Sequence, residues 1–179
     1  MRKQLNLSIA IAAYNAEKNI EHMLESLLRQ KEGDDFSIGE IIVHCDNCID
    51  ETVTIANSFR NAKILVINKM ERKGFAGSVK AILEICGGDI CILLNDDIKI
   101  NDDNFIKKLI IPFEDDTDVG LVSGNPQPLP PINFVERAVI SSFHAYENMR
   151  IKINNGNTNY TCDGKILALS REFKDKLFF

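Results

Sequence analysis

Short apolar runs alternate along the chain with segments whose apolar residues recur every three or four positions. The apolar runs predict strands at residues 7–12, 40–44, 63–68, 90–94, 119–123 and 166–170. The helical periodicity predicts helices at residues 16–30, 52–59, 74–86, 105–113, 134–153 and 171–176. Strands and helices in alternation are typical of an α/β fold, a mostly parallel sheet with helices on both faces.

Three segments refine this picture. Residues 90–94 are apolar throughout, which favours a central strand buried on both faces. Residues 125–131 are rich in proline and predict a loop. The helix predicted at 134–153 carries Phe134, Phe143 and Tyr146, and we expect these aromatic side chains in the core.

Composition and charge narrow the class of protein. The chain has 179 residues, of which 45% are hydrophobic and 26% charged, as in one ordinary globular domain. No run approaches the ~18 apolar residues of a membrane-spanning helix. The net charge of −5, with scattered Lys and Arg, argues against a nucleic-acid partner. Five cysteines without a secretory signal predict free thiols in a reducing compartment.

Polar and charged residues follow four of the predicted strands, at residues 13–15, 45–50, 68–74 and 95–97. In open α/β sheets, ligands bind beyond the carboxyl ends of the strands. The pattern therefore predicts a nucleotide or phosphate site at one edge of the sheet. For each segment alone, a turn or a helix cap remains an alternative, because Asn and Asp favour both.

Asn95, Asp96 and Asp97 form the strongest single feature. Adjacent carboxylates directly after a buried strand are costly unless a cation faces them. Mg²⁺ or Mn²⁺ typically binds through one or two carboxylates together with substrate phosphates. The alternative is a solvated Asp-Asp turn.

Taken in order, four segments resemble the motifs of family-two glycosyltransferases: residues 7–30, 41–52, 74–77 and 92–97. Residues 45–52 resemble the family's Asp-Asp-Gly-Ser-Thr-Asp-Gly-Thr loop, and residues 95–97 its Asp-x-Asp. The resemblance extends from about residue 7 to residue 175. It implies the GT-A fold, a Rossmann-like α/β domain, and transfer of a glycosyl group from a nucleotide sugar.

The resemblance also implies roles for the matching residues. Asp97 would bind the metal, Mg²⁺ or Mn²⁺, and Asp46 would accept a hydrogen bond from a uracil-like base. Arg72 or Lys73 would approach the base or the phosphates. The full set implied to bind the nucleotide sugar is Ala13, Tyr14, Asn15, Asp46, Arg72, Lys73, Gly74, Asn95 and Asp96.

Some positions depart from the family pattern. Asn95 replaces the first acid of Asp-x-Asp, and Cys45 and Cys48 replace a common Asp and Ser. A C-x-x-C pair can also bind zinc or act in redox chemistry, but no matching second pair is present. The resemblance assigns this loop to the nucleobase instead.

The resemblance bears on domain organisation as well. We expect one GT-A domain over residues 1–179, truncated at its C-terminus, because the chain ends in an apolar run. Residues 1–100 would form the nucleotide-binding part, and residues 101–179 the start of an acceptor-side part. The family's general base lies beyond this region, so we expect it after Phe179, with Asp163 as a candidate within the chain.

The activity implied is inverting, metal-assisted transfer, of the hexosyltransferase kind, from a UDP-sugar to a hydroxyl of a carbohydrate or lipid-linked acceptor. Synthesis of a cell-envelope polysaccharide fits this chemistry. We expect a cytoplasmic location. The alternative is peripheral association with the inner face of the membrane, through parts of the protein outside the chain. The alternatives are a sugar-nucleotide nucleotidyltransferase and a non-catalytic nucleotide-sugar-binding module. The former usually has a glycine-rich basic loop after its first strand, which residues 12–16 lack.

Overall fold

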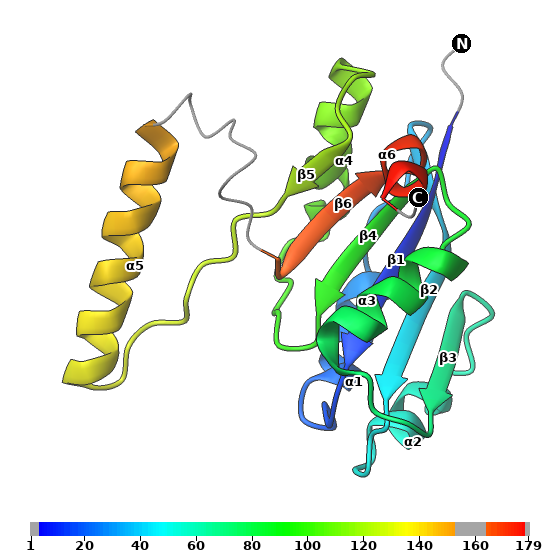
Figure 1. Cartoon of the computed structure of the whole chain (residues 1–179), viewed down its shortest axis with the longest axis horizontal. Coiled ribbons are helices and arrows are strands. Elements are labelled where there is room, and N and C mark those ends of the chain that lie inside the picture. Colours follow the sequence, from blue (N-terminus) through cyan, green and yellow to red (C-terminus); the bar gives the residue numbers. More distant parts are fainter. Residues whose placement is uncertain (1–3, 153–163, 178–179) are drawn as a thin grey trace.

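A computed structural model describes residues 4–152 and 164–177, which form a six-stranded sheet with helices on both faces (Figure 1). The strand order is β3-β2-β1-β4-β6-β5; the pairs from β3 to β4 are parallel, and β6 runs antiparallel to both β4 and β5. The elements are β1 (Leu5–Ala13), α1 (Ile20–Leu28), β2 (Phe36–Asp46), α2 (Thr52–Ser58), β3 (Ile64–Lys69), α3 (Gly74–Ile85), β4 (Ile90–Asn95), α4 (Phe105–Asp115), β5 (Leu121–Ser123), α5 (Phe134–Lys152), β6 (Ile166–Ser170) and α6 (Arg171–Lys176).

The α/β class predicted from the sequence is confirmed, and the main differences concern three boundaries. Helix α1 begins at Ile20 rather than residue 16, because Ala16 O accepts the N–H groups of Asn19 and Ile20 in a preceding turn. Strand β2 begins at Phe36, where it first pairs with β1. Helix α4 continues through Pro112, whose carbonyl still accepts the Asp116 N–H at the end of the helix.

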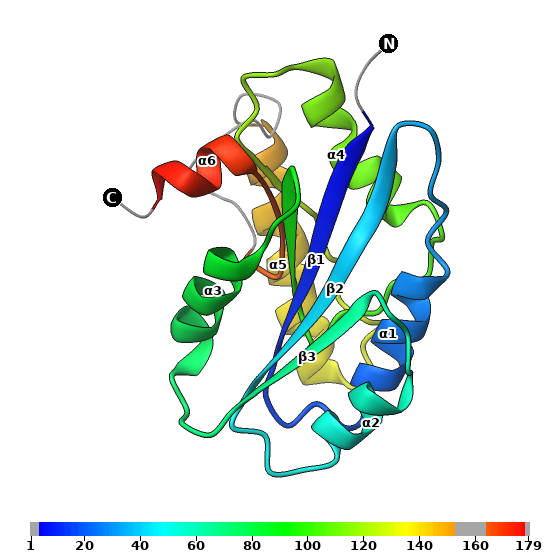
Figure 2. The same cartoon turned by 90° about the vertical axis from the view of Figure 1, so that its right-hand side faces the viewer.

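Apolar side chains from the two faces of the sheet form two core layers. Helices α1, α2 and α4 pack on one face, and α3 and α6 cover the other (Figure 2). Ile9 of β1 lies between Ile41 of β2 and Ile92 of β4, and all three are buried. Strand β4 is central, as predicted, because it lies between β1 and β6.

The order of the strands reverses at the boundary between β1 and β4. The chain moves outward from β1 to β2 and β3, then crosses back to place β4 on the other side of β1. In open α/β sheets this reversal opens a crevice beyond the carboxyl ends of the two strands, and ligands bind there. A ligand site is therefore expected at the loops after β1 and β4.

Helix α5 lies apart from the sheet (Figure 1). The expected core position of its aromatic residues is wrong for Phe134 and Tyr146, which are 83% and 48% exposed, whereas Phe143 is partly buried and contacts His144 edge-on. The pattern predicts the helix correctly, but among the described residues no other element covers the apolar side chains of α5. Within residues 4–152 and 164–177, no helix has both the length and the apolar character to cross a membrane.

His44 is a buried polar residue on β2. It is 2% exposed, and neither ring nitrogen has a hydrogen-bond partner among the described residues. Burial lowers the pKa of His44, and the nearby Lys69 lowers it further, while Asp46 opposes them. The imidazole is therefore neutral in the folded protein at neutral pH.

We expect His44 to make the fold sensitive to acid. Below about pH 6.5 the unfolded chain binds a proton at His44 that the folded chain does not, so the free energy of unfolding falls as pH decreases, by at most ~1.4 kcal/mol per pH unit. Urea unfolding of wild type and His44→Leu between pH 7.5 and 5.5 measures this. The variant should lose less stability over that range, whereas the exposed His22→Gln should follow the wild type; equal slopes for all three would contradict the expectation.

Candidate functional site

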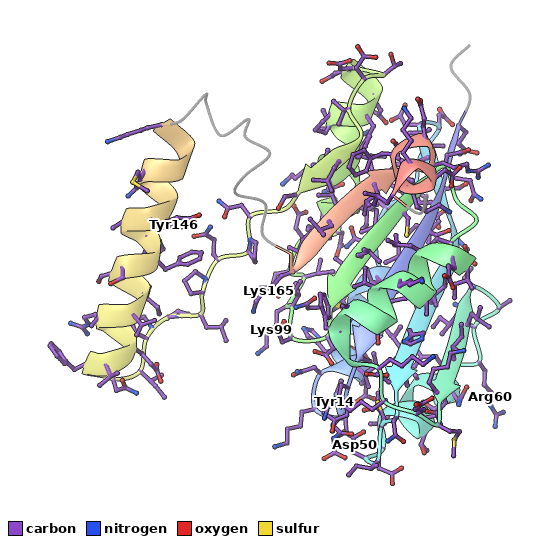
Figure 3. All side chains as sticks on the ribbon, in the orientation of Figure 1. Tyr14, Asp50, Arg60, Lys99, Tyr146 and Lys165 are labelled. Atoms are coloured by element: carbon purple, nitrogen blue, oxygen red, sulfur yellow. The ribbon has the colours of Figure 1, made fainter. Side chains whose placement is uncertain are left out.

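Residues that follow β1, β2, β3 and β4 meet beyond the carboxyl ends of these parallel strands. Figure 3 shows Tyr14, after β1, and Asp50, after β2, at the end of the sheet toward which these strands point. The sequence-predicted segments 13–15, 45–50, 68–74 and 95–97 are joined there by the contacts described below. The predicted convergence at one edge is therefore present in the structure.

Tyr14 and Asp96 connect β1 to β4 at the point where the strand order reverses. The backbone N–H of Tyr14 donates to Oδ2 of Asp96 over 2.9 Å. Burial raises the pKa of Asp96, and the neighbouring charge of Asp97 raises it further, while the Tyr14 N–H opposes both. This contact fixes the orientation of one of the two predicted carboxylates.

Asp46 holds the start of helix α3. Its carboxylate is 4% exposed and accepts two backbone hydrogen bonds, from Lys73 N at 2.8 Å and from Gly74 N at 2.7 Å. Gly74 has a φ of +72°, a conformation that favours glycine. Asp46, which the resemblance assigns to the nucleobase, therefore holds the glycine segment at residues 74–77 against the end of β2.

Arg72 and Tyr14 form a stacked pair on the surface of the site. The guanidinium carbon of Arg72 lies 3.8 Å from the centroid of the Tyr14 ring, within the range of a cation–π interaction. Tyr14 is 40% exposed, so the pair presents a planar, positively charged surface to solvent. This contact joins two of the segments that were predicted to meet at one edge of the sheet, residues 13–15 and 68–74.

The loops after β1 and β2 are joined by side-chain hydrogen bonds of Asn15, Asp50 and Thr52, which all lie in segments that resemble the family motifs. The Thr52 hydroxyl accepts the Ala16 N–H over 2.7 Å and lies 2.5 Å from Oδ1 of Asp50. Asp50 also accepts the Glu17 N–H, and Asn15, at a φ of +51°, accepts the Ile49 N–H through its side chain. Burial raises the pKa of Asp50, but the hydrogen bonds from Thr52 and Glu17 outweigh it and lower the pKa overall.

We expect Thr52→Val to destabilise the protein by about 1–3 kcal/mol, because it leaves the buried Ala16 N–H without its acceptor. Valine keeps the shape of the side chain, so packing is conserved. Thr54→Val on the same helix is the control, since Thr54 is exposed. Thermal unfolding of both variants measures the difference, and equal stabilities would show that the hydroxyl is dispensable.

Asp97 forms an ion pair with a residue that the sequence analysis did not predict. Nζ of Lys165 lies 2.8 Å from Oδ2 of Asp97, and both side chains are about half exposed. Lys165 comes directly before β6, and its carbonyl accepts the Asn95 N–H over 3.0 Å. Only the antiparallel pairing of β6 with β4 brings these two residues together, and no local pattern in the sequence signals it.

A cavity of ≈ 560 Å³ opens beside this ion pair. Its walls come from the segment after β4, from the proline-rich loop and from the start of β6, and Figure 3 shows Lys99 and Lys165 close to each other on this side of the molecule. The cavity is lined by Asp97, Ile98, Lys99, Ile100, Asn101, Asp102, Phe105, Asn125, Pro126, Gln127, Pro128, Leu129, Lys165 and Ile166. It is large enough for a small sugar or phosphate ligand.

The carboxylates fit a divalent cation only if other ligands join them. In the described part of the chain, no group of three His, Cys, Asp or Glu side chains could hold a metal ion by itself. Asp97 with Asp96 supplies the one or two carboxylates through which Mg²⁺ or Mn²⁺ binds when substrate phosphates complete its shell. This donor set therefore fits a cation that arrives with a phosphorylated ligand.

The remaining sequence hypotheses concern cysteines and Asp163. Cys45, Cys48, Cys86 and Cys91 are free thiols. Burial and the neighbouring Cys48 raise the pKa of Cys45 to about 12, which disfavours the thiolate that zinc binding or redox chemistry requires. Asp163, the candidate base within the chain, lies outside the described residues.

The chain is similar in sequence to known glycosyltransferases. Residues 8–178 match the family "Glycosyl transferase family 2". A relative from Escherichia coli, named UDP-Glc:alpha-D-GlcNAc-diphosphoundecaprenol beta-1,3-glucosyltransferase WfaP, is 34% identical over 91 residues, or 51% of this chain and 35% of the relative.

Solved structures share the fold. The mannosyltransferase PcManGT from Pyrobaculum calidifontis, in complex with GDP-Man and Mn²⁺, matches with a TM-score of 0.78 and 18% identity, over 98% of this chain and 47% of its own. Glucosyl-3-phosphoglycerate synthase from Mycobacterium tuberculosis, in complex with UDP, matches with a TM-score of 0.63 and 20% identity, over 94% and 57%. The chain thus spans between about a third and just over half of the length of these relatives.

Proposed function

Because the chain belongs to glycosyl transferase family 2, we propose that it binds a nucleoside diphosphate sugar and transfers the sugar to an acceptor hydroxyl. The observation that carries this proposal is the convergence of Tyr14, Asp46, Arg72 and the Asp96–Asp97 pair beyond the ends of four parallel strands. A positively charged aromatic surface and a pair of carboxylates on one edge suit the base and the metal-bound diphosphate of such a donor.

Different residues would contact the base, the ribose, the sugar and the phosphates of the donor. The Arg72–Tyr14 stack would hold the planar base, with Ala13 and Asn15 beside it and Asp46 accepting a hydrogen bond from a ring N–H. The amide of Asn95 would reach the ribose, and Asp96, fixed by the Tyr14 N–H, would lie beside the ribose or the sugar. Lys73 and Gly74 would approach the phosphates from the start of α3.

Asp97 would hold the divalent cation, with the phosphates of the donor completing its ligands. When bound, Mg²⁺ or Mn²⁺ would supply the positive charge that stabilises the departing nucleoside diphosphate. The half-exposed carboxylate of Asp97 at the edge of the ≈ 560 Å³ cavity supports this role. The acceptor hydroxyl would attack from the opposite face of the sugar, which inverts the anomeric centre, and its general base would come from outside the described residues.

We propose a UDP-sugar as the donor and a lipid-linked or carbohydrate acceptor. The E. coli relative is named for a UDP-glucose donor and a diphosphoundecaprenol-linked acceptor, which supports both assignments, and the M. tuberculosis structure contains UDP. The P. calidifontis structure holds GDP-Man, so a guanine base is the competing assignment. A lipid-linked acceptor would bring the protein to the cytoplasmic surface of a membrane and to cell-envelope polysaccharide synthesis.

Titration calorimetry with UDP and GDP, each with Mn²⁺ and with EDTA, tests the donor assignment. We expect UDP to bind in Mn²⁺, to bind much less in EDTA, and to bind more tightly than GDP. Failure of both nucleotides to bind under all four conditions would contradict the proposal.

Product analysis separates transfer from the alternatives. Release of UDP from a UDP-sugar in the presence of an acceptor supports a transferase. Release of diphosphate from a nucleoside triphosphate and a sugar phosphate would indicate a nucleotidyltransferase. Binding of UDP-sugar without turnover, in a protein that also contains the segments that the longer relatives have, would indicate a binding module.

A further inference from the structure

Lys165 is set in a fixed position beside the acidic end of β4. Its carbonyl accepts the Asn95 N–H over 3.0 Å, and the next residue, Ile166, is paired with Leu94. Its backbone therefore moves with β4, and its ammonium reaches Asp97 over 2.8 Å. The two side chains are about half exposed, but the backbone of Lys165 keeps its ammonium within reach of Asp97.

Positively charged side chains lie near Asp97. Asp96 and Asp97 bring two carboxylates, and Lys165 and Lys99 bring two ammonium groups to the same side of the molecule (Figure 3). Lys165 touches the outermost carboxylate, the one that a divalent cation would bind. A cation can bind Asp97 only by displacing the ammonium or by sharing the carboxylate with it.

We propose that Lys165 competes with the divalent cation for Asp97. Before the donor arrives, the Lys165 ammonium is paired with Asp97. Once the metal binds Asp97, the ammonium pairs with the donor diphosphate instead. This inference rests on the proposed function. Metal alone would bind weakly, because it must displace an ammonium. Metal with a nucleoside diphosphate would bind well, because the ammonium released from Asp97 pairs with the neighbouring diphosphate.

The proposal predicts that Lys165→Met changes two affinities in opposite directions. Without nucleotide, Mn²⁺ should bind about two- to five-fold more tightly than to wild type at low salt, which is what the loss of a surface ion pair is worth. With saturating Mn²⁺, UDP should bind about ten-fold more weakly, because one charge-assisted contact to phosphate is lost. Lys165→Arg keeps the charge and should remain close to wild type in both.

Electron paramagnetic resonance of free Mn²⁺ measures the first affinity, and calorimetry with UDP the second. Lys99→Met is the matched control: it removes the same charge from the same cavity, and no hydrogen bond or ion pair joins Lys99 to Asp97 in the described structure. Mn²⁺ should bind Lys165→Met more tightly than Lys99→Met. Equal or weaker binding of Mn²⁺ to Lys165→Met, or no binding to either, would overturn the proposal.

The two proposals fail in different ways. If UDP and GDP bind to no variant, the donor assignment is wrong, while the order of Mn²⁺ affinities still decides whether Lys165 competes for Asp97. If UDP binds with Mn²⁺ but Lys165→Met has the Mn²⁺ affinity of Lys99→Met, the donor site stands and the competitor role of Lys165 is wrong.

Discussion

Asp97→Asn is expected to abolish Mn²⁺-dependent binding of UDP. The amide keeps the size of the side chain but removes the negative charge that faces the cation. Mutation of the outer partners of metal ligands costs ~10–100-fold in metal affinity or activity, so loss of the ligand itself should cost at least ~100-fold. Calorimetry of UDP in Mn²⁺ measures this loss, whereas the binding that remains in EDTA should not fall, because the lost carboxylate repels the diphosphate and its removal frees Lys165.

Asp102→Asn is the matched control for this prediction. It removes the same charge from a residue that lines the same cavity, but Asp102 is paired with Lys108 and not with Lys165. UDP should bind this variant as it binds wild type. Equal losses in the two variants would mean that net charge, and not a cation on Asp97, controls nucleotide binding.

Asp46→Ala is expected to have the largest effect on stability among the site residues. The carboxylate is buried, and its removal leaves the N–H groups of Lys73 and Gly74 without acceptors at the start of α3. Each hydrogen bond to a charged group contributes about 1.5–3 kcal/mol, so we expect the free energy of unfolding to fall by ~3 kcal/mol. Urea unfolding measures this, and Asp34→Ala, in an exposed loop, should change little.

Asp46→Asn separates the structural role of this residue from its proposed contact with the base. The amide oxygen can still accept one of the two N–H groups, so the variant should remain folded at low temperature. If Asp46 also accepts a hydrogen bond from uracil, UDP should bind this variant about ten-fold more weakly. Unchanged UDP affinity in a folded Asp46→Asn protein would limit Asp46 to holding α3.

Much of the fold and the position of the site follow from patterns that are local in the sequence. The uninterrupted apolar run at residues 90–94 is enough to predict a buried central strand, and the acids after it are enough to predict a charged edge. The order of parallel strands then brings Tyr14 next to Asp96. The predictions of the central strand and of the charged edge both depend on short segments, whose composition strongly favours a buried strand or a charged turn.

Other features depend on long-range contacts that no local pattern encodes. The ion pair of Lys165 with Asp97 needs β6 to lie antiparallel beside β4. The use of Asp46 to hold α3 needs the turn at Gly74 to bring two N–H groups to one carboxylate. The exposure of Phe134 shows a further limit. An apolar pattern predicts a helix but does not say which element covers its apolar side chains.

The most direct test of the donor site is paramagnetic broadening of backbone amide signals by Mn²⁺ in the presence of UDP. We expect the signals of Tyr14, Asp97 and Ile166 to broaden first. The signals of Leu5 and Ile90 should persist longest, because they lie at the opposite ends of β1 and β4, and a strand rises ~3.3 Å per residue. The pattern should disappear in Asp97→Asn. Broadening centred away from the carboxyl ends of these strands, or unchanged in Asp97→Asn, would contradict a cation and diphosphate site at Asp97.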